Sequence, residues 1–556
     1  MATNKELADL IFPEITETVK NLEERYPERK LPEGAEVTRF APSPTGFLHT
    51  GSLFTALVAW KFAKQSDGIA FFRLEDTDQK REVAGTGLDL VQQLKRFGIT
   101  FDEGYFGDHE VGDYGPYTQS KRADIYKICI KELIRKGRAY PDFCSKEELD
   151  QLRLVQEANK VIPGYYGEYA KWHHVSVQEY IDNIKSGKPY VIRFKSKGNH
   201  LNHITAHDEI RGDMELTEND QDIVILKSDG LPTYHFAHLV DDHFMHTTLV
   251  TRGEEWISSL PIHLELFASM GWKAPKYAHL PVIMINDKET GNKRKLSKRK
   301  DPEAAAANFL TEGYPVEGVI KYLLTIANSN FEQWLMDNPH GQMKDFQLSF
   351  SKFSLDGALF DIPKLENISK EVLANYDKKT FTDLALEWAG NNDAELAGYI
   401  QADRDRFESI INIERDQEKP RKDYIRFSDV TSKIRFFYPD KFDALIKEPL
   451  PFSEFIDHDT IKAVLADFAE TLDLEHQDEN TWFAAMKVLG TRHGFADDRK
   501  VYKKDPTAFK GWYADVISLI RVTLCASTQS PKLFDVLTIL GKNEIERRIQ
   551  EVEALL

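Results

Sequence analysis

The sequence predicts an α/β domain built on a parallel sheet, followed by an all-helical half. Residues 37–41 and 70–74 have the apolar and β-branched or aromatic composition of buried strands, and Leu53, Leu57 and Trp60 lie between them at helical spacing. The order strand, helix, strand predicts parallel pairing through a right-handed crossover. From about residue 350 onward the apolar residues follow the helical period, so we expect the sheet domain to end before residue 350.

The residues before the first strand carry one apolar stripe. Leu7, Ile11, Ile15, Val19 and Leu22 recur at steps of four or three, which predicts a single amphipathic helix. Pro13 is expected to kink this helix or to mark its true start, and the turn-forming residues 31–34 end it.

The middle of the chain predicts an insertion into the sheet domain. Residues from about 108 to 220 are mixed and polar, with short strands such as 190–195. Buried-strand character resumes at 222–226 and 247–251, followed by a helix at 257–270 and a strand at 280–285. The C-terminal segment repeats the helical period, through Val536, Leu537, Leu540, Ile545, Ile549 and Val552.

Composition limits the class of protein. The 556 residues include 72 Lys and Arg against 90 Asp and Glu, a net charge of −18, and the length suggests three or four domains at roughly 100–200 residues each. The acidic balance argues against non-specific coating of nucleic acid, but an RNA partner needs only a local basic stripe. No apolar run reaches the ~20 residues of a membrane span. Because early acids such as Glu6, Asp9 and Glu14 do not fit a targeting signal, we expect a cytoplasmic protein.

Two segments carry candidate chemistry. In residues 41–52, two prolines and two glycines shape a loop that enters a helix, where N–H groups attract phosphate and His49 can add a donor. An ordinary strand-to-helix turn is the competing interpretation. Residues 293–300 hold six basic residues in eight. They fit a mobile loop that brings ammonium groups to a triphosphate, or else a solvated charge run or localisation signal.

Together the two segments resemble the signatures of class I aminoacyl-tRNA synthetases. The match is closer to bacterial-type glutamyl-tRNA synthetases, because 39–46, 73–78, 229–235 and 251–256 resemble that family's motifs in order. The resemblance is strong from about 36 to 300, moderate around 353–376 and 520–540, and faint between. Thr50 and Ser52 depart from the usual residues, whereas His49 and Gly51 are kept.

The resemblance implies a Rossmann-type catalytic domain with an inserted α+β acceptor-binding domain, then an all-α anticodon-binding half. The implied boundaries are a helical leader at 1–35, the catalytic domain at 36–110 and 221–290, the insertion at 111–220, the signature loop and stem-contact region at 291–370, and the anticodon-binding region at 371–556.

The family's reaction supplies the expected function: ATP-dependent attachment of L-glutamate to the 3′ end of tRNA-Glu, with tRNA-Gln as a second candidate substrate, through a glutamyl-adenylate. The resemblance places His49 and Lys298 in catalysis. It assigns ATP binding to Pro42, Ser43, Pro44, Thr45, Gly46, His49, Gly51, Glu255, Ile283, Lys295, Ser297 and Lys298. Glu255 could instead be only a salt-bridge partner of Arg252.

Glutamate offers two carboxylates and one ammonium, so a selective pocket needs two cations and an anion. Arg39, Arg252 and Glu75 supply these charges, although either arginine alone could be a structural ion pair. The family's glutamate-binding positions match Arg39, Ala41, Ser43, Glu75, Tyr234, His238 and Arg252. His238 stands where some relatives carry Asn.

We expect Mg²⁺ with ATP, no zinc and a monomer. His235, His238, His243 and His246 resemble metal ligands, with Asp241 and Asp242 beside them. In the resemblance, however, they form a pocket wall. The three cysteines Cys129, Cys144 and Cys525 lack metal-binding spacing, which excludes a disulfide framework and a four-thiolate zinc site.

Two basic-aromatic stretches of the helical half, 419–427 and 499–513, could stack bases and hold phosphates, or could be ordinary helix surface. Three other classes of protein remain in view. A glutaminyl-tRNA synthetase usually ends in β-barrels, a truncated relative that modifies a tRNA base lacks an anticodon domain, and a non-catalytic RNA-binding protein would be expected to lose His49 or Lys298.

Overall fold

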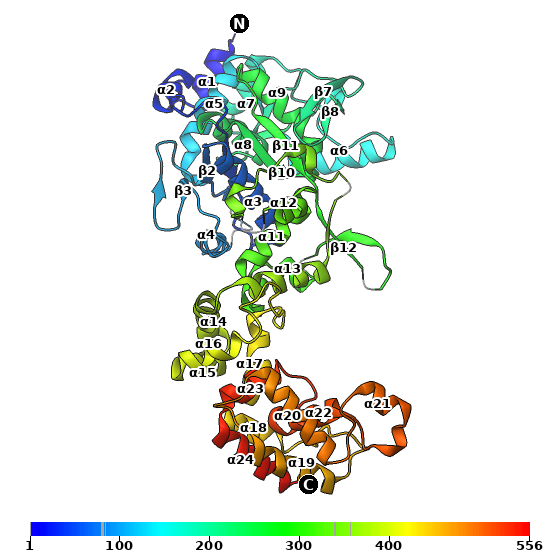
Figure 1. Cartoon of the computed structure of the whole chain (residues 1–556). Helices are drawn as coiled ribbons and strands as arrows, with labels where there is room; N and C mark the ends of the chain where they lie inside the picture. Colours follow the sequence, from blue (N-terminus) through cyan, green and yellow to red (C-terminus); the bar gives the residue numbers. More distant parts are fainter. Residues whose placement is uncertain are drawn as a thin grey trace. The chain divides into compact units, whose positions relative to one another are not determined.

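The computed structural model describes residues 2–78, 80, 83, 85–287, 289–297, 299–338, 341–355 and 357–556. The chain forms two compact units (Figure 1). The first unit comprises Met1–Asn308 and Ile320–Asp361, and the second comprises Phe309–Val319 and Ile362–Leu556. Within the described residues, no helix combines the length and the apolar character that crossing a membrane requires.

A six-stranded sheet forms the centre of the first unit, in the order β11-β10-β1-β2-β3-β4. The first five strands in that order run parallel, and β4 is antiparallel to β3. The predicted parallel sheet is therefore confirmed. Its strands are β1 Val37–Phe40, β2 Ile69–Phe72, β3 Glu103–Tyr105, β4 Glu110–Val111, β10 Leu249–Gly253 and β11 Lys276–Leu280.

Helix α3, Thr50–Gln65, connects β1 to β2 as the sequence predicts. From β1 the chain proceeds outward through β2 and β3, and it later returns to the other side of β1 with β10 and β11. The strand order therefore reverses between β1 and β10. In open parallel sheets this switch point is where ligands bind, at the carboxyl ends of the strands.

The segment between β4 and β10 contains two further sheets. One has the order β5-β6-β9, and the other is the hairpin β7-β8. The strand expected at 222–226 is present as β9 but does not belong to the parallel sheet, because it pairs antiparallel with β6. The strands are β5 Ala139–Asp142, β6 Val191–Phe194, β7 His203–Asp208, β8 Gly212–Thr217 and β9 Val224–Leu226.

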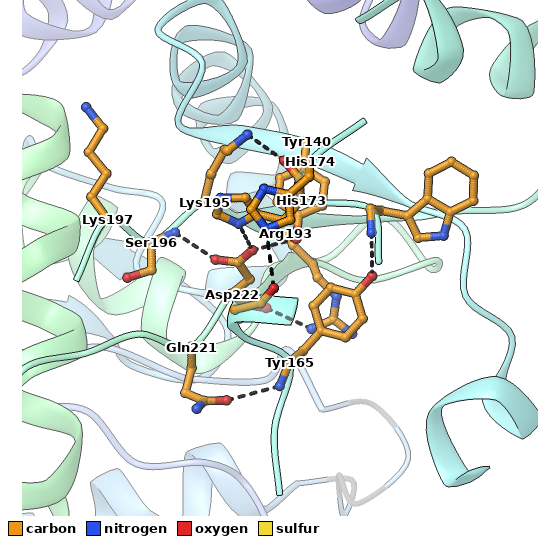
Figure 2. Close-up of polar contacts among 12 residues, drawn as sticks. Tyr140, Tyr165, His173, His174, Arg193, Lys195, Ser196, Lys197, Gln221 and Asp222 are labelled. Atoms are coloured by element: carbon orange, nitrogen blue, oxygen red, sulfur yellow. Dashed lines mark hydrogen bonds and ion pairs between the residues drawn. The ribbon is translucent and has the colours of Figure 1, made fainter. Parts of the chain in front are cut away.

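Asp222 explains why this strand joins β6. Its carboxylate accepts hydrogen bonds from the hydroxyl of Tyr140 at 2.6 Å and the backbone N–H of Ser196 at 2.8 Å, and it contacts Nδ1 of His173 (Figure 2). Arg193 of β6 also donates to the carbonyl oxygen of Asp222 at 2.8 Å. These partners lie far from Asp222 in sequence, so the local pattern predicted the strand but not its sheet.

The leader forms two helices instead of the single predicted helix, α1 Asn4–Ile11 and α2 Val19–Arg25. Pro13 follows Phe12, the C-cap of α1, and its missing N–H and fixed ring disfavour further helix there. The Lys131 ammonium donates to the carbonyl oxygens of Phe12 and Ile15, at 2.8 Å each, and so satisfies acceptors that the broken helix leaves. Lys131 belongs to α5, Ala123–Arg135.

The strand expected at 280–285 is also two strands. Strand β11 ends at Leu280, and β12 begins after Pro281 in a separate sheet of order β13-β12-β14. Because β14 pairs with β12, the sheet-containing part extends to residue 360, and the expected end before residue 350 is wrong. The strands are β12 Ile283–Asn286, β13 Lys293–Lys295 and β14 Ala358–Phe360.

The helix expected at 257–270 starts as a 3-10 helix, Glu254–Ser259, and continues as α9, Leu260–Met270. The remaining helices before residue 340 are α4 Thr86–Arg96, α6 Lys146–Ala158, α7 Val177–Lys185, α8 Tyr234–Phe244, α10 Ala306–Glu312, α11 Val316–Ala327 and α12 Phe331–Asp337.

Residues from 362 onward are helical, as predicted. The apolar residues singled out between 536 and 552 are all buried. The helices are α13 Ile362–Asn375, α14 Lys378–Asn392, α15 Ala394–Ala402, α16 Arg404–Ile411, α17 Val430–Ile434, α18 Pro439–Leu445, α19 His458–Thr471, α20 Glu479–Arg492, α21 Arg499–Lys504, α22 Tyr513–Cys525, α23 Leu533–Leu540 and α24 Lys542–Glu553.

Candidate active site

The two predicted substrate-binding arginines lie on neighbouring strands at the switch point. Arg39 lies near the end of β1 and Arg252 near the end of β10, and the two strands pair in parallel. Arg252 is also in register with His279 of β11, so these two side chains share a face of the sheet. Both arginines are 5% exposed. The parallel topology thus gathers basic groups at the edge where the sequence predicted a ligand.

Arg39 belongs to a buried network of arginines and carboxylates. Its Nε lies 3.4 Å from Oδ2 of Asp242, and its Nη1 donates to the carbonyl oxygen of Thr251 at 3.2 Å. Arg73 donates to Oδ1 of Asp242 at 2.6 Å and to Oε1 of Glu75 at 3.0 Å. Burial raises the pKa of Glu75, with Arg73 and Arg39 opposing it. For Asp242 burial also acts to raise the pKa, but the two arginines outweigh it and hold the pKa well below its usual range.

Asp241, the neighbour of Asp242 on α8, extends this network, with Oδ2 3.9 Å from Nε of Arg73. Arg122 donates to its Oδ1 at 2.6 Å, while Gln119 and Tyr126 donate to its Oδ2 at 2.9 and 2.8 Å. The sequence presented Asp241 and Asp242 only as part of a metal-like pattern. Their role follows from their position on a buried helix opposite Arg73. Arg73 belongs to the motif 73–78, but the sequence assigned it no role.

Arg252 has a different environment, made of neutral acceptors. Its Nε donates to Nε2 of His279 at 3.0 Å, its Nη1 to Nδ1 of His263 at 3.0 Å, and its Nη2 to the carbonyl oxygen of Trp256 at 3.4 Å. The hydroxyl of Tyr234 lies 3.5 Å from Nη1. Within the described part of the chain, no carboxylate lies within ion-pairing distance of Arg252.

Glu255 therefore does not serve as the salt-bridge partner of Arg252, the alternative that the sequence left open. It is half-exposed, and its Oε1 lies 3.9 Å from Nζ of Lys295 in β13. This contact links a predicted ATP-binding carboxylate to the basic segment. It places Glu255 and Lys295 in one neighbourhood without fixing either role.

Tyr234 and His238 line the same region from α8. The ring of Tyr234 lies 4.3 Å from that of Trp256 and 6.0 Å from that of His238. His238 is fully buried, with Nε2 3.0 Å from the hydroxyl of Tyr277 and Nδ1 2.8 Å from Oδ2 of Asp242. Burial lowers the pKa of His238 to about 4, so the imidazole is neutral near pH 7.

The loop between β1 and α3 leads directly into the N-terminus of α3. His49 is the N-cap of α3, and its Nδ1 accepts the backbone N–H of Gly51 at 2.9 Å. A Cβ at Gly51 would lie 3.2 Å from that nitrogen, so a side chain there would press on the imidazole. Ser43 and Thr45 are exposed, and the carbonyl oxygens of Pro42 and Pro44 accept N–H groups from residues 75 and 83. Gly46 has a φ of 145°, which favours glycine.

The residues that follow the basic segment, 305 and 306, lie beside this loop along the backbone. The N–H of Ala306 donates to the carbonyl oxygen of Leu48 at 3.0 Å, and residues 49 and 305 form a β-bridge. Arg294 donates to Asp287 at 2.7 Å and to both oxygens of Asp301 at 2.6 and 2.7 Å, and Asp301 also accepts the N–H of Ser297. The carbonyl oxygen of Ile283 accepts the N–H of Leu296. Lys298 lies outside the described residues.

The four histidines of the metal-like pattern point to different partners. His235 contacts His263 through Nδ1 at 2.9 Å, His243 pairs with Glu23, and His246 contacts the carbonyl oxygen of Tyr26. Among the described residues, no group of three or more His, Cys, Asp or Glu side chains is arranged to hold a metal ion.

The two basic-aromatic stretches have different environments. In residues 419–427, Tyr424 and Phe427 are buried, so their rings are not available to stack on bases, and Arg421, Lys422 and Arg426 are ion-paired. In residues 499–513, by contrast, the lysines of α21 are exposed, and Arg499 lies 5.8 Å from the ring of Trp512.

Comparison with known proteins identifies the family of the chain. Residues 36–354 match the family described as tRNA synthetases class I (E and Q), catalytic domain, and residues 511–553 match an anticodon binding domain. The chain is 44% identical over 550 residues to the glutamate–tRNA ligase of Clostridium perfringens strain SM101, covering 99% of both chains. It is 38% identical to that of Sorangium cellulosum, over 97% of this chain and 99% of the other.

A solved structure extends the match to the fold. The glutamate tRNA ligase of Elizabethkingia meningosepticum CCUG26117, crystallised in complex with its amino acid, aligns with a TM-score of 0.74 at 26% identity, over 94% of this chain and 100% of the other. The family match covers more than half of the chain, and the sequence relatives span nearly all of it. The chain therefore belongs to the glutamyl-tRNA synthetases, within the class I aminoacyl-tRNA synthetases.

Proposed function

We propose that the switch-point site activates glutamate with ATP and transfers it to tRNA in two steps. The α-carboxylate of glutamate attacks the α-phosphate of ATP, forming glutamyl-adenylate and releasing pyrophosphate. The terminal ribose hydroxyl of the tRNA then takes the glutamyl group, and AMP leaves. Neither step needs a covalent bond to the enzyme, so positioning and charge stabilisation supply the catalysis.

One observation carries the assignment of the glutamate pocket. Arg252 is a buried guanidinium that, within the described residues, meets only neutral acceptors. A buried charge without a counter-charge is costly, and a substrate carboxylate would supply the missing partner. Arg39 would serve the other carboxylate, with Glu75 facing the ammonium. Ala41, Ser43, Tyr234 and His238 complete the proposed glutamate-binding set.

The phosphates of ATP are proposed to lie at the N-terminus of α3. The loop Pro42, Ser43, Pro44, Thr45 and Gly46 presents backbone groups there, with His49 and Gly51 beside it. Lys295, Ser297 and Lys298 would approach from the basic segment, while Glu255 and Ile283 would hold the nucleoside. Mg²⁺ would arrive on the triphosphate, because this ion keeps mainly phosphate and water ligands and needs no dedicated protein cage.

For tRNA we propose the division implied by the sequence: residues 111–220 on the acceptor stem, 291–370 on the adjoining stem, and 371–556 on the anticodon. The matched anticodon binding domain and the exposed lysines of α21 support the last assignment. We further propose a monomer that acts in the cytoplasm on tRNA-Glu, with tRNA-Gln as a possible second substrate.

The decisive experiment is charging of purified tRNA-Glu and tRNA-Gln with glutamate, using glutamine as the control amino acid. The wild-type enzyme should charge tRNA-Glu with glutamate and not with glutamine. The Arg252→Ala variant should no longer use glutamate efficiently in the charging reaction, while its KM for ATP stays near the wild-type value. A variant that charges normally would remove Arg252 from the proposed pocket.

A further inference from the structure

Arg252 is supported by two histidines whose protonation follows from the hydrogen bonds. An arginine can only donate, so Nε2 of His279 and Nδ1 of His263 must both be unprotonated acceptors. His279 therefore carries its proton on Nδ1, which lies 2.7 Å from Oδ2 of Asp208. His263 carries its proton on Nε2, which lies 2.9 Å from Nδ1 of His235. Each imidazole is thus fixed as a single neutral tautomer.

The carboxylate of Asp208 anchors this arrangement. Asp208 is fully buried at the end of β7, and its Oδ1 accepts the backbone N–H groups of Ile210 and Arg211 at 3.0 Å each. Its Oδ2 also accepts the backbone N–H of His279 at 3.0 Å. The hairpin β7-β8 is held against the sheet by the N–H of Glu209, which donates to the carbonyl oxygen of Tyr277 at 2.8 Å.

The interposed imidazole has a physical consequence for the charge of Arg252. A direct ion pair, as between Arg39 and Asp242, places a carboxylate against the guanidinium and partly neutralises it. Asp208 instead orients Arg252 through His279, one side chain away. Of the five N–H groups of a guanidinium, the two short bonds to histidine use one on Nε and one on Nη1. Both terminal nitrogens therefore keep donor capacity for a carboxylate.

We propose that Asp208, His279 and His263 are positioning residues that hold Arg252 charged, fixed and free of a protein carboxylate, so that it binds a carboxylate of the amino-acid substrate. The inference rests on the proposed role of Arg252 and extends the glutamate pocket to a hairpin within the inserted segment. Orienting partners of this kind typically change affinity by about 10–100-fold when they are removed from metal-bound histidines. We expect a similar size here.

The test uses charging of tRNA-Glu, with the KM for glutamate and for ATP measured separately. Asp208→Asn should raise the KM for glutamate by about 10–100-fold and leave that for ATP near wild type, because the amide no longer fixes the tautomer of His279. His263→Leu should do the same. His263→Asn should recover much of the loss, since its amide oxygen can replace Nδ1 as the acceptor. His243→Leu is the matched control, a histidine of the same unit that pairs with Glu23.

The results separate this inference from the proposed function. If Arg252→Ala raises the KM for glutamate but Asp208→Asn and His263→Leu do not, the positioning roles are wrong and the pocket stands. If Arg252→Ala itself leaves that KM unchanged, the pocket assignment fails first. If the KM for glutamate and the KM for ATP rise equally, Asp208 and His263 have a structural role only. The same conclusion follows for His263 if His263→Asn and His263→Leu do not differ. Should Asp208→Asn not fold, the two His263 variants decide the question.

Discussion

Arg39 and Asp242 form a buried ion pair in which Nε lies 3.4 Å from Oδ2, whereas Arg252, equally buried, has no such partner among the described residues. The two arginines of the predicted pocket are therefore not equivalent. Asp242 also accepts from Arg73 at 2.6 Å, so its charge is shared between two guanidinium groups. The difference bears directly on which arginine discriminates glutamate from glutamine.

Arg252→Ala should narrow the preference for glutamate over glutamine more than Arg39→Ala does. This expectation takes Arg252 to face the side-chain carboxylate of glutamate. The side-chain amide of glutamine would leave the charge of Arg252 unneutralised and would direct N–H groups at the guanidinium. A site built around a polar group can reject an analogue that lacks this group by about 10⁴–10⁵. Charging rates for both amino acids, in wild type and in both variants at matched folding, provide the measurement. If Arg39→Ala lost more selectivity than Arg252→Ala, then Arg39 would be the arginine that discriminates glutamate from glutamine.

Asp242→Asn should destabilise the first unit strongly. The substitution leaves Arg73 and Arg39 without a carboxylate that both now contact, and breaking a buried pair costs about 3–5 kcal/mol. Asp213→Asn is the matched control, because Asp213 is mostly exposed and pairs with His207. Exposed pairs contribute about 0–1 kcal/mol. Urea unfolding of both variants tests the difference, and similar losses would contradict the buried-network interpretation.

These residues also show how far the sequence could predict the molecule. The pattern at 37–74 gave the first strand, crossover helix and second strand, because each depends on local periodicity. The resemblance assigned Arg39, Glu75 and Arg252 to one pocket, and the parallel topology brings the carboxyl ends of β1, β2 and β10 to one edge of the sheet. Local pattern did not reveal that β9 pairs with β6, since Asp222 finds its partners through the tertiary fold.

The residues that hold Arg252 in place could not be predicted from the sequence for a similar reason. His263, His279 and Asp208 lie on a helix and two strands of different sheets, and no spacing in the sequence joins them. Asp241 and Asp242 were conspicuous beside histidines, yet the structure uses them as partners of Arg122 and Arg73. Asp241 and Asp242 find their counter-charges across the fold, and such pairs cannot be predicted from neighbours in sequence.

The leader should contribute to stability through Arg29. Its guanidinium makes two bonds to Glu103, at 2.8 and 2.9 Å, and lies 3.8 Å from the ring centroid of Tyr114. Arg29 is nearly buried, so Arg29→Ala leaves Glu103 without its cationic partner and should cost about 3–5 kcal/mol. Arg25→Ala removes an exposed pair with Glu17 and should cost about 0–1 kcal/mol. Equal thermal midpoints for the two variants would show that the leader is not held by Arg29.

Buried histidines should make the first unit sensitive to mild acid. Burial lowers the pKa of both His235 and His238 to about 4, against about 6.5 for an unfolded histidine. Between those values the unfolded chain binds the extra protons, so the stability present above about pH 6.5 is lost as the pH falls toward 4. Each histidine contributes at most about 1.4 kcal/mol per pH unit.

His235→Gln should remove one of these contributions and so flatten the pH dependence of the free energy of unfolding. Urea unfolding at about pH 7 and about pH 5, for wild type and variant, measures the difference in slope. His476→Gln serves as the control, because that side chain is exposed and pairs with Asp473. If His235→Gln keeps the full wild-type slope, the imidazole of His235 is not the group that resists protonation.

The preparation should contain no stoichiometric zinc. Burial raises the pKa of the Cys144 thiol to about 11, and zinc requires the thiolate. The Sγ atom lies 3.5 Å from the hydroxyl of Tyr165 instead. Elemental analysis of the purified chain tests this directly, and chelation should affect activity only through Mg²⁺. One zinc per chain would refute the prediction and would direct attention to Cys144 and to the histidines between His235 and His246.

Lys298→Ala should impair the ATP half of the reaction selectively. The motif places Lys298 against the pyrophosphate, where loss of one electrostatic stabiliser lowers the rate by about 10²–10³. Glutamate binding should change little, because the basic segment is proposed to contact phosphates and the proposed glutamate pocket lies at β1 and β10. Lys300→Ala, an exposed lysine of the same segment, is the matched control. ATP–pyrophosphate exchange with tRNA-Glu present, together with the KM for glutamate, separates the two effects. Near-normal exchange in Lys298→Ala, or an equal loss in Lys300→Ala, would mean that the segment acts by its total charge and that Lys298 has no specific role.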